Sequence, residues 1–216
     1  PGVMNRTVRL AQENGVGVGA HPGYPDLAGF GRRNMDCTPD EVRDDVIYQI
    51  GALRGFCALH GVRLQHVKPH GSLYNMCVGN ESLSEAVAEA IAAVDRSLFW
   101  VTLGGAQADL ARKIAAAAGI RVVFEAFPDR AYTPDGKLAP RKLPGAVITD
   151  PQRAADQALW MAKEGRVIAM DGTVVDLEVQ TLCVHGDNPA ALHHIRTIRQ
   201  ALEAEGIHIA PLGASA

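Results

Sequence analysis

The stretch LQHVKPHGSLYN, residues 64–75, places a lysine and a histidine on either side of a proline. An ammonium group can stabilise developing negative charge, and an imidazole can accept or donate a proton near neutral pH. Because the ring of Pro69 fixes the φ angle of that residue, we expect Lys68 and His70 to be held rigidly. We assign both to catalysis and Tyr74 of the same stretch to substrate binding. The alternative interpretation is a stiff loop that carries solvated charges.

A second candidate is the sequence CVHGD, which ends at Asp187. Imidazole and carboxylate groups are typical ligands of zinc and other divalent ions, so His185 and Asp187 could hold a metal. They could equally form an acid/base pair in which Asp187 orients the ring of His185 and raises its basicity. The spacing does not decide between the two, and we assign both residues to catalysis.

A third candidate is the stretch VGVGAHPGYPDLAGFGRR, residues 16–33, which turns abruptly from an apolar run into titratable residues, glycines and prolines. His21 ends the apolar run and Asp26 follows it. Arg32 and Arg33 are either anion-binding residues or part of a solvated loop. We assign these four residues to substrate binding, on a rim shaped by the glycines and prolines.

The sequence FPDR provides one more pair of charged residues, Asp129 and Arg130. A planar guanidinium matches the geometry of a substrate carboxylate, so Arg130 could bind one. The two side chains could also simply pair with each other at the rim of the fold. We include both among the substrate-binding candidates.

Each of these groups follows an apolar run of strand length. Runs that are apolar throughout are typical of strands covered on both faces of a parallel sheet. Helical patterns lie between most of them, so the chain is predicted to be α/β with a parallel sheet, open or closed into a barrel. The expected strands lie around Val18, Val67, Val101, Val123 and Cys183, with another at HIAPL near the C-terminus.

Helix starts are marked by capping residues. Thr38, Pro39 and Glu41 form a capping-box pattern, and Ser82 with Glu85 suggests another start. Asp-Pro at 150–151 and Asn-Pro at 188–189 are further predicted starts. The segment RVIAMDGTVVDLEV is expected to form a hairpin that turns at Asp171-Gly172.

Because binding residues gather at the carboxyl ends of parallel strands, the polar groups are predicted to converge on one cleft. Three histidines, one lysine and three aspartates would surround it. They are His21, Asp26, Lys68, His70, Asp129, His185 and Asp187.

Length and composition exclude several classes of protein. With 216 residues, 47% of them hydrophobic, the chain suits one globular domain. The net charge is -3 and the basic residues are scattered among acids, so neither nucleic acid nor a membrane is an expected partner. The four cysteines form no CxxC pair, which favours reduced thiols in a cytoplasmic protein. The sequence contains no GxxxxGK[ST] phosphate loop and no GxSxG motif.

Several long motifs resemble those of the LamB/YcsF family, over essentially the whole chain. The resemblance rests on GVGVGAHPGYPDLAGFGRRNM, HVKPHGSLYNM, FPDRAYTPDGKLAPR, PGAVITDP and CVHGDNP. It implies an irregular seven-stranded (β/α) barrel of the glycoside hydrolase/deacetylase type, with residues 1–216 as a single barrel domain. The implied activity is that of the first component of ATP-dependent 5-oxoprolinase, which opens the lactam of 5-oxoproline to give glutamate. Subunits B and C would be the partners, and ATP would be handled together with them.

This chemistry suggests roles for the candidate residues. Amide hydrolysis needs a base, an acid for the leaving nitrogen and stabilisation of an oxyanion. We expect His70 or His185 to act as acid and base, and Lys68 to stabilise the negative charge. Arg130 or Arg33 would hold the substrate carboxylate.

The sequence departs from the family pattern at its start. Family members begin with a strand motif resembling DLNADLGE and a later HAGD, which do not occur here before the opening PG. The first helical pattern begins at Pro1 without a capping residue. We therefore expect the chain to begin inside a longer protein, so that the barrel lacks its N-terminal strand.

Two other functions stay open. One is a metal-dependent deacetylase or amidohydrolase acting on a sugar or small amide, with a divalent metal on His21, His70 or His185. The other is a non-catalytic subunit that holds a small carboxylate while partner chains carry out the reaction.

Overall fold

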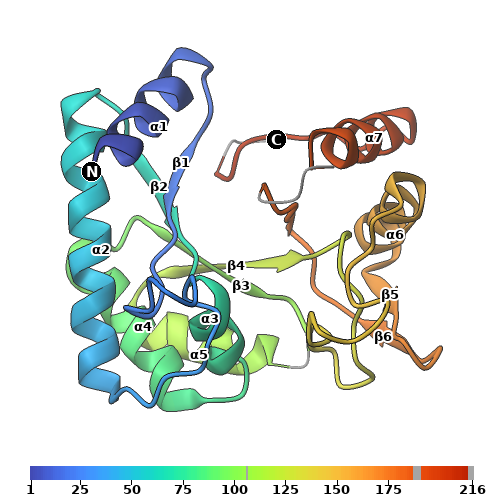
Figure 1. The fold of residues 1–216 in the computed structure, drawn as a ribbon, viewed down its shortest axis with the longest axis horizontal. Coiled ribbons are helices and arrows are strands. Elements are labelled where there is room, and N and C mark those ends of the chain that lie inside the picture. Colours follow the sequence, from blue (N-terminus) through green and yellow to red (C-terminus); the bar gives the residue numbers. More distant parts are fainter. Residues whose placement is uncertain (106, 187–190, 214–216) are drawn as a thin grey trace. The chain divides into compact units, whose positions relative to one another are not determined.

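The computed structural model describes residues 1–105, 107–186 and 191–213 (Figure 1). The chain divides into two compact units. We call residues 1–102 and 109–123 the first unit, and residues 103–108 and 124–216 the second unit. Each unit is described by itself below.

Five strands belong to one sheet, in the order β1-β2-β3-β4-β7. The pairings of β1 with β2, β2 with β3 and β4 with β7 are parallel, which confirms the predicted α/β class. The prediction of a strand at HIAPL is wrong, because residues 208–212 form no strand. Pro211 lacks the N–H that a strand ladder needs, and Ile209 is exposed. The strands are β1 (Val18–Ala20), β2 (Leu64–Val67), β3 (Phe99–Leu103), β4 (Arg121–Ala126) and β7 (Thr181–Leu182).

The helices of the first unit begin close to the predicted capping residues. The capping box of Thr38 and Glu41 is confirmed. The start predicted at Ser82 is wrong by a short distance, because the side chain of Asn80 caps the helix instead by accepting from the N–H of Leu83 at 3.1 Å. These helices are α1 (Gly2–Glu13), α2 (Pro39–Leu59), α3 (Gly71–Cys77), α4 (Glu81–Val94) and α5 (Ala108–Ala118).

The core of the first unit forms where α2 packs against α4. Val42, Val46 and Ile50 recur every four residues, and this spacing places them on one face of α2, where all three are buried. Burying an aliphatic side chain of this size contributes about 1.5–3 kcal/mol. Helix α2 is the long helix at the left of Figure 1. This packing makes the first unit a firm support for the loops that follow β1 and β2.

The second unit combines two packed helices with a hairpin. Helices α6 (Pro151–Glu164) and α7 (Ala191–Ala204) share a core that includes Ile148, Ala158, Ile198 and Leu202. The carboxylate of Asp150 caps α6 as predicted. The capping residues predicted at 188–189 lie outside the described residues. The predicted hairpin is confirmed as the antiparallel pair β5 (Arg166–Ile168) and β6 (Val174–Asp176).

Helix α3 was not predicted, and it begins directly after the first candidate group. Strand β2 ends at Val67, and α3 begins at Gly71 with His70 as its N-cap residue. Gly71 has a φ of +57°, and a Cβ atom added there would lie 2.4 Å from the carbonyl oxygen of Gly31. Only glycine fits this position without a shift of the backbone. The connection therefore fixes Lys68 and His70 between two regular elements.

Among the helices of the described residues, none combines the length and the apolar character needed to cross a lipid bilayer.

Candidate functional site

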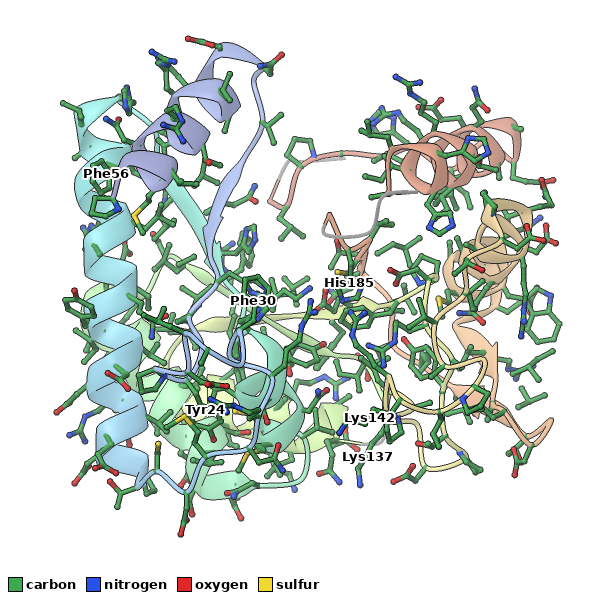
Figure 2. The ribbon with its side chains drawn as sticks, viewed as in Figure 1. Tyr24, Phe30, Phe56, Lys137, Lys142 and His185 are labelled. Carbon is green, nitrogen blue, oxygen red and sulfur yellow. The ribbon has the colours of Figure 1, made fainter. Side chains whose placement is uncertain are left out.

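The candidate residues follow the carboxyl ends of strands, as the sequence predicted. In the first unit, His21 follows β1, while Lys68 and His70 follow β2. In the second unit, Asp129 follows β4 and His185 follows β7. Figure 2 labels Phe30 on the long loop after β1 and His185 after β7. Asp187 lies outside the described residues.

The loop after β1 is organised around a buried carboxylate. Asp26 accepts hydrogen bonds from the backbone N–H of Gly29 at 2.9 Å and from the Nε of Arg33 at 3.0 Å, and it forms an ion pair with the guanidinium of Arg33. A Cβ atom at Gly29 would collide with both side chains. The Arg33 side chain lowers the pKa of Asp26 to about 2. Both residues were predicted to bind substrate, and here they bind each other.

This pair gives a prediction about pH. The pKa of Asp26 is about 2 in the folded protein, against an ordinary value of 3.8 for an aspartate that is free of such contacts. The ion pair therefore stabilises the fold fully at pH values above the ordinary pKa. This stabilisation is lost as the pH falls through the pKa of Asp26 in the folded protein. Asp26→Asn should therefore destabilise the protein at neutral pH. At a pH below the folded-state pKa of Asp26, the variant and the wild type should be about equally stable. Urea unfolding of wild type and variant across this range measures the effect.

An exposed ion pair provides the control for that measurement. Arg166 and Asp176 pair on the hairpin with side chains that are 52% and 84% exposed. Asp176→Asn should change stability little at any pH, because exposed pairs contribute little. If the free energy of unfolding of Asp26→Asn differed from that of wild type by the same amount at every pH, the stabilising role assigned to the ionised Asp26 would be wrong.

The same loop is tied to the β2–α3 connection by backbone and side-chain hydrogen bonds. The backbone N–H of His70 donates to the carbonyl of Pro22 at 2.7 Å, and that of Ser72 donates to Gly31 at 2.8 Å. The Gln49 side chain of α2 accepts from the N–H of Gly23 at 3.0 Å and donates to its carbonyl at 2.8 Å. A long loop without regular structure is thereby held in one conformation.

His21 and His70 contact each other directly. Nε2 of His21 lies 3.1 Å from Nδ1 of His70, and the two rings are nearly perpendicular. The other ring nitrogen of each histidine contacts a backbone carbonyl oxygen. Nδ1 of His21 lies 2.6 Å from the carbonyl oxygen of Lys68, and Nε2 of His70 lies 2.8 Å from that of Phe30. Although the His21 ring keeps an exposed edge, the protein atoms around it remove much of its hydration, which lowers the pKa of His21 to about 4.

Lys68 and Tyr74 also lie together in the first unit. The Lys68 ammonium lies 5.8 Å from the centre of the Tyr74 ring, in the range of a cation–π contact. Lys68 is partly buried and Tyr74 is buried. The rigid arrangement predicted for Lys68 and His70 is supported by the short connection, in which Pro69 is also buried.

In the second unit, Asp129 and His185 form a hydrogen-bonded pair. Oδ2 of Asp129 lies 2.8 Å from Nδ1 of His185. The Asp129 side chain is 2% exposed and that of His185 is 20% exposed, so the carboxylate is buried behind the ring. The ring also stacks on Phe127, with a centroid distance of 5.6 Å. Because a carboxylate accepts from Nδ1–H, the lone pair of His185 is left on Nε2, where it can accept a proton.

The backbone around Asp129 is fixed from several directions. The side-chain amide of Gln157 on α6 donates to the carbonyls of Phe127, Pro128 and Arg130 at 3.2, 3.1 and 2.8 Å. The hydroxyl of Tyr132 accepts from the N–H of Phe127 at 2.9 Å, and burial raises the pKa of that hydroxyl. Sequence reasoning did not identify Gln157 or Tyr132 as supporting residues.

Arg130 donates hydrogen bonds to backbone carbonyls. Its Nε donates to the carbonyl of Ala146 at 3.2 Å, and a terminal nitrogen donates to the carbonyl of Ala139 at 2.5 Å. The residue is 5% exposed. Its guanidinium therefore holds the segment after β4 together, and a substrate carboxylate would have to compete with these carbonyls.

The described residues contain no group of three or more His, Cys, Asp or Glu side chains arranged to hold a metal ion. The cysteines are all free thiols.

Comparison with known proteins establishes the family. The model of the LamB/YcsF family matches residues 1–216. The chain belongs to the LamB/YcsF family. The resemblance of the long motifs is thereby confirmed, and it extends over the whole chain.

Curated relatives in this family share about half of their residues with the chain. The 5-oxoprolinase A subunit of Pyrococcus abyssi is 53% identical over 98% of this chain and 82% of its own length. That of Thermus thermophilus is 51% identical over 97% of this chain and 82% of its own length. A crystal structure of the lactam utilization protein from Thermus thermophilus matches with a TM-score of 0.87 at 49% identity, covering 97% of this chain and 82% of that one.

Proposed function

We propose that this member of the LamB/YcsF family is the A component of an ATP-hydrolysing 5-oxoprolinase, which cleaves the lactam of 5-oxo-L-proline to give L-glutamate. The observation that carries the proposal is identity of about half of all residues with curated 5-oxoprolinase A subunits, over 98% of the chain in the case of Pyrococcus abyssi. The name of the similar crystal structure, a lactam utilization protein, supports the same chemistry.

Lactam hydrolysis requires proton transfer at two points. A base removes a proton from the attacking water, and an acid protonates the ring nitrogen as the amide bond breaks. We assign both steps to His185, because its Nδ1–H is held by Asp129 at 2.8 Å and Nε2 is left to take up a proton and return it. The buried Asp129 stabilises the imidazolium that forms between the two steps. In this assignment Asp129 performs the orienting role that the sequence suggested for Asp187.

Negative charge develops on the lactam oxygen when water attacks. We assign Lys68 to this charge, since its ammonium is partly buried and held beside the Tyr74 ring. Arg32 and Tyr74 remain substrate-binding candidates. Arg33 and Arg130 are weaker candidates for the substrate carboxylate, because both donate to acceptors of the protein itself.

ATP supplies the driving force for an otherwise uphill ring opening. The sequence has no phosphate-binding GxxxxGK[ST] motif, and we propose that ATP is handled together with the partner subunits B and C. The complex is proposed to be cytoplasmic, and the parallel sheet to be part of a seven-stranded barrel.

Reconstitution tests the proposed function. The full chain is combined with candidate B and C subunits, and glutamate and ADP are measured after addition of 5-oxoproline and ATP. We expect glutamate to form only when all three subunits and ATP are present. Glutamate formation by B and C alone would show that this chain is a non-catalytic subunit. If an assembled complex of all three subunits formed no glutamate, the proposed function would be wrong.

A further inference from the structure

Phe30, labelled in Figure 2, has a backbone conformation that residues other than glycine rarely adopt. Its φ is +56°, and every other positive φ among the residues that the structure describes belongs to a glycine. In this left-handed region the Cβ atom crowds the following carbonyl oxygen, so a phenylalanine there is strained. Glycine occupies positions 29 and 31, and yet the strained position between them carries a phenyl ring.

Hydrogen bonds on both sides of Phe30 hold its backbone in this conformation. The N–H of Phe30 donates to the carbonyl of Leu27 at 3.3 Å, and the N–H of Gly31 donates to that of Asp26 at 2.9 Å. The carbonyl oxygen of Phe30 lies 2.8 Å from Nε2 of His70. A strained residue persists only where its surroundings determine its conformation, and such residues gather at functional sites. The loop after β1 therefore fixes the direction in which the Phe30 side chain leaves the backbone.

Burial does not explain why the strained residue is aromatic. Phe30 is 62% exposed, so its ring gains little from the core. Its ring neighbours are two candidate site residues. The His70 ring is nearly perpendicular to it at a centroid distance of 5.2 Å, and the Arg32 guanidinium lies 5.1 Å from its centroid. An apolar surface is thus held open beside a candidate catalytic residue and a candidate carboxylate-binding residue.

We propose that Phe30 is a substrate-binding and specificity-determining residue, whose ring contacts the methylene groups of the lactam ring of 5-oxoproline. This inference rests on the proposed function and deepens it. The substrate is a small ring with an amide on one edge, a carboxylate on one carbon and two neighbouring methylenes that form no hydrogen bonds. An aromatic ring is a fitting partner for those methylenes, while Arg32 lies beside it for the carboxylate. The product glutamate has no such ring, so the contact favours substrate over product.

Steady-state kinetics of the reconstituted complex tests this role. Phe30→Gly and Phe30→Ala both remove the ring, and we expect each to raise KM for 5-oxoproline by about tenfold or more, with a much smaller change in kcat. Phe30→Tyr keeps the ring and should keep KM close to that of wild type. The ratio of kcat/KM for 5-oxoproline to that for its six-membered lactam homologue should fall in both ring-free variants.

Urea unfolding separates this role from a structural one. Phe30→Gly relieves the left-handed strain, so this variant should be at least as stable as wild type, whereas Phe30→Ala keeps the strain. A ring that served stability would leave both variants less stable. Leu27→Ala is the matched control, because Leu27 lies on the same loop with a side chain that is 98% exposed. It should leave KM unchanged.

Two results would overturn the inference. One is an unchanged KM in an active Phe30→Gly complex. The other is loss of assembly on size-exclusion chromatography with KM unchanged in the complex that remains, since Phe30 would then contact a partner subunit. Failure of the proposed function would be seen separately, as absence of glutamate with wild type. Calorimetric titration of the assembled complex with 5-oxoproline, without ATP, then decides. Binding about tenfold weaker in Phe30→Gly would support the inference, and equal or undetectable binding would refute it.

Discussion

Replacing His185 by alanine is expected to lower kcat of the reconstituted complex by about 10²–10⁴-fold, the usual contribution of a general acid/base. The variant removes the Nε2 lone pair that would take the proton from water. It should leave KM nearly unchanged, because the ring is assigned to proton transfer and not to substrate binding. Steady-state glutamate formation at several 5-oxoproline concentrations separates kcat from KM.

The partner carboxylate gives a second variant for the same prediction. Asp129→Asn keeps the size of the side chain and removes its charge, so the imidazolium of His185 loses its stabilising partner. We expect a loss of about 10²-fold or more, and no further loss when both residues are replaced, because they act as a unit. His193→Ala on α7 is the matched control, since that histidine is exposed. Normal turnover in either His185→Ala or Asp129→Asn, with assembly intact, would rule out the assignment.

The second large effect is expected for Gly71→Ala, on stability. The left-handed φ of +57° costs an alanine about 1–2 kcal/mol. In addition, the new Cβ would lie 2.4 Å from the Gly31 carbonyl oxygen, a backbone atom that cannot swing away. We expect the free energy of unfolding to fall by at least about 3 kcal/mol.

Gly61→Ala separates the two contributions to that loss. Gly61 has a φ of +66°, but nothing lies within 4 Å of the position that its Cβ would take. The free energy of unfolding of this variant should fall only by the cost of the left-handed φ, about 1–2 kcal/mol. Urea unfolding of both variants gives the difference, which is the cost of the collision. Equal losses would show that the contact between Gly31 and Gly71 is not tight.

Local signals in the sequence predicted much of the fold. The caps at Thr38 and Asp150 depend on residues within three positions of each other, and the structure shows both. The apolar runs predicted the five strands of the parallel sheet in the same way, because a run of apolar residues is itself a local signal. The prediction that polar residues follow these strands also held for His21, Lys68 and His185.

Partners distant in sequence could not be predicted in this way. Asp129 and His185 are 56 positions apart, so no local spacing indicates their hydrogen bond, and the adjacent Asp187 was the natural candidate. The contact of His21 with His70 spans 49 positions. Gln157 is a polar residue in a helix, and nothing in the neighbouring sequence indicates that its amide donates to three backbone carbonyls. Helix α3 has only 7 residues, which is too short for a clear periodic signal.

The abrupt change from β2 to α3 has a consequence for how relatives of this protein can diverge. Between Val67 and Gly71 there is no spare residue, because Lys68, Pro69 and His70 each occupy a buried or bonded position. An insertion there would displace the lysine and the histidine together. We therefore expect this junction to stay constant in length among relatives, because a change of length would disturb both candidate residues at once.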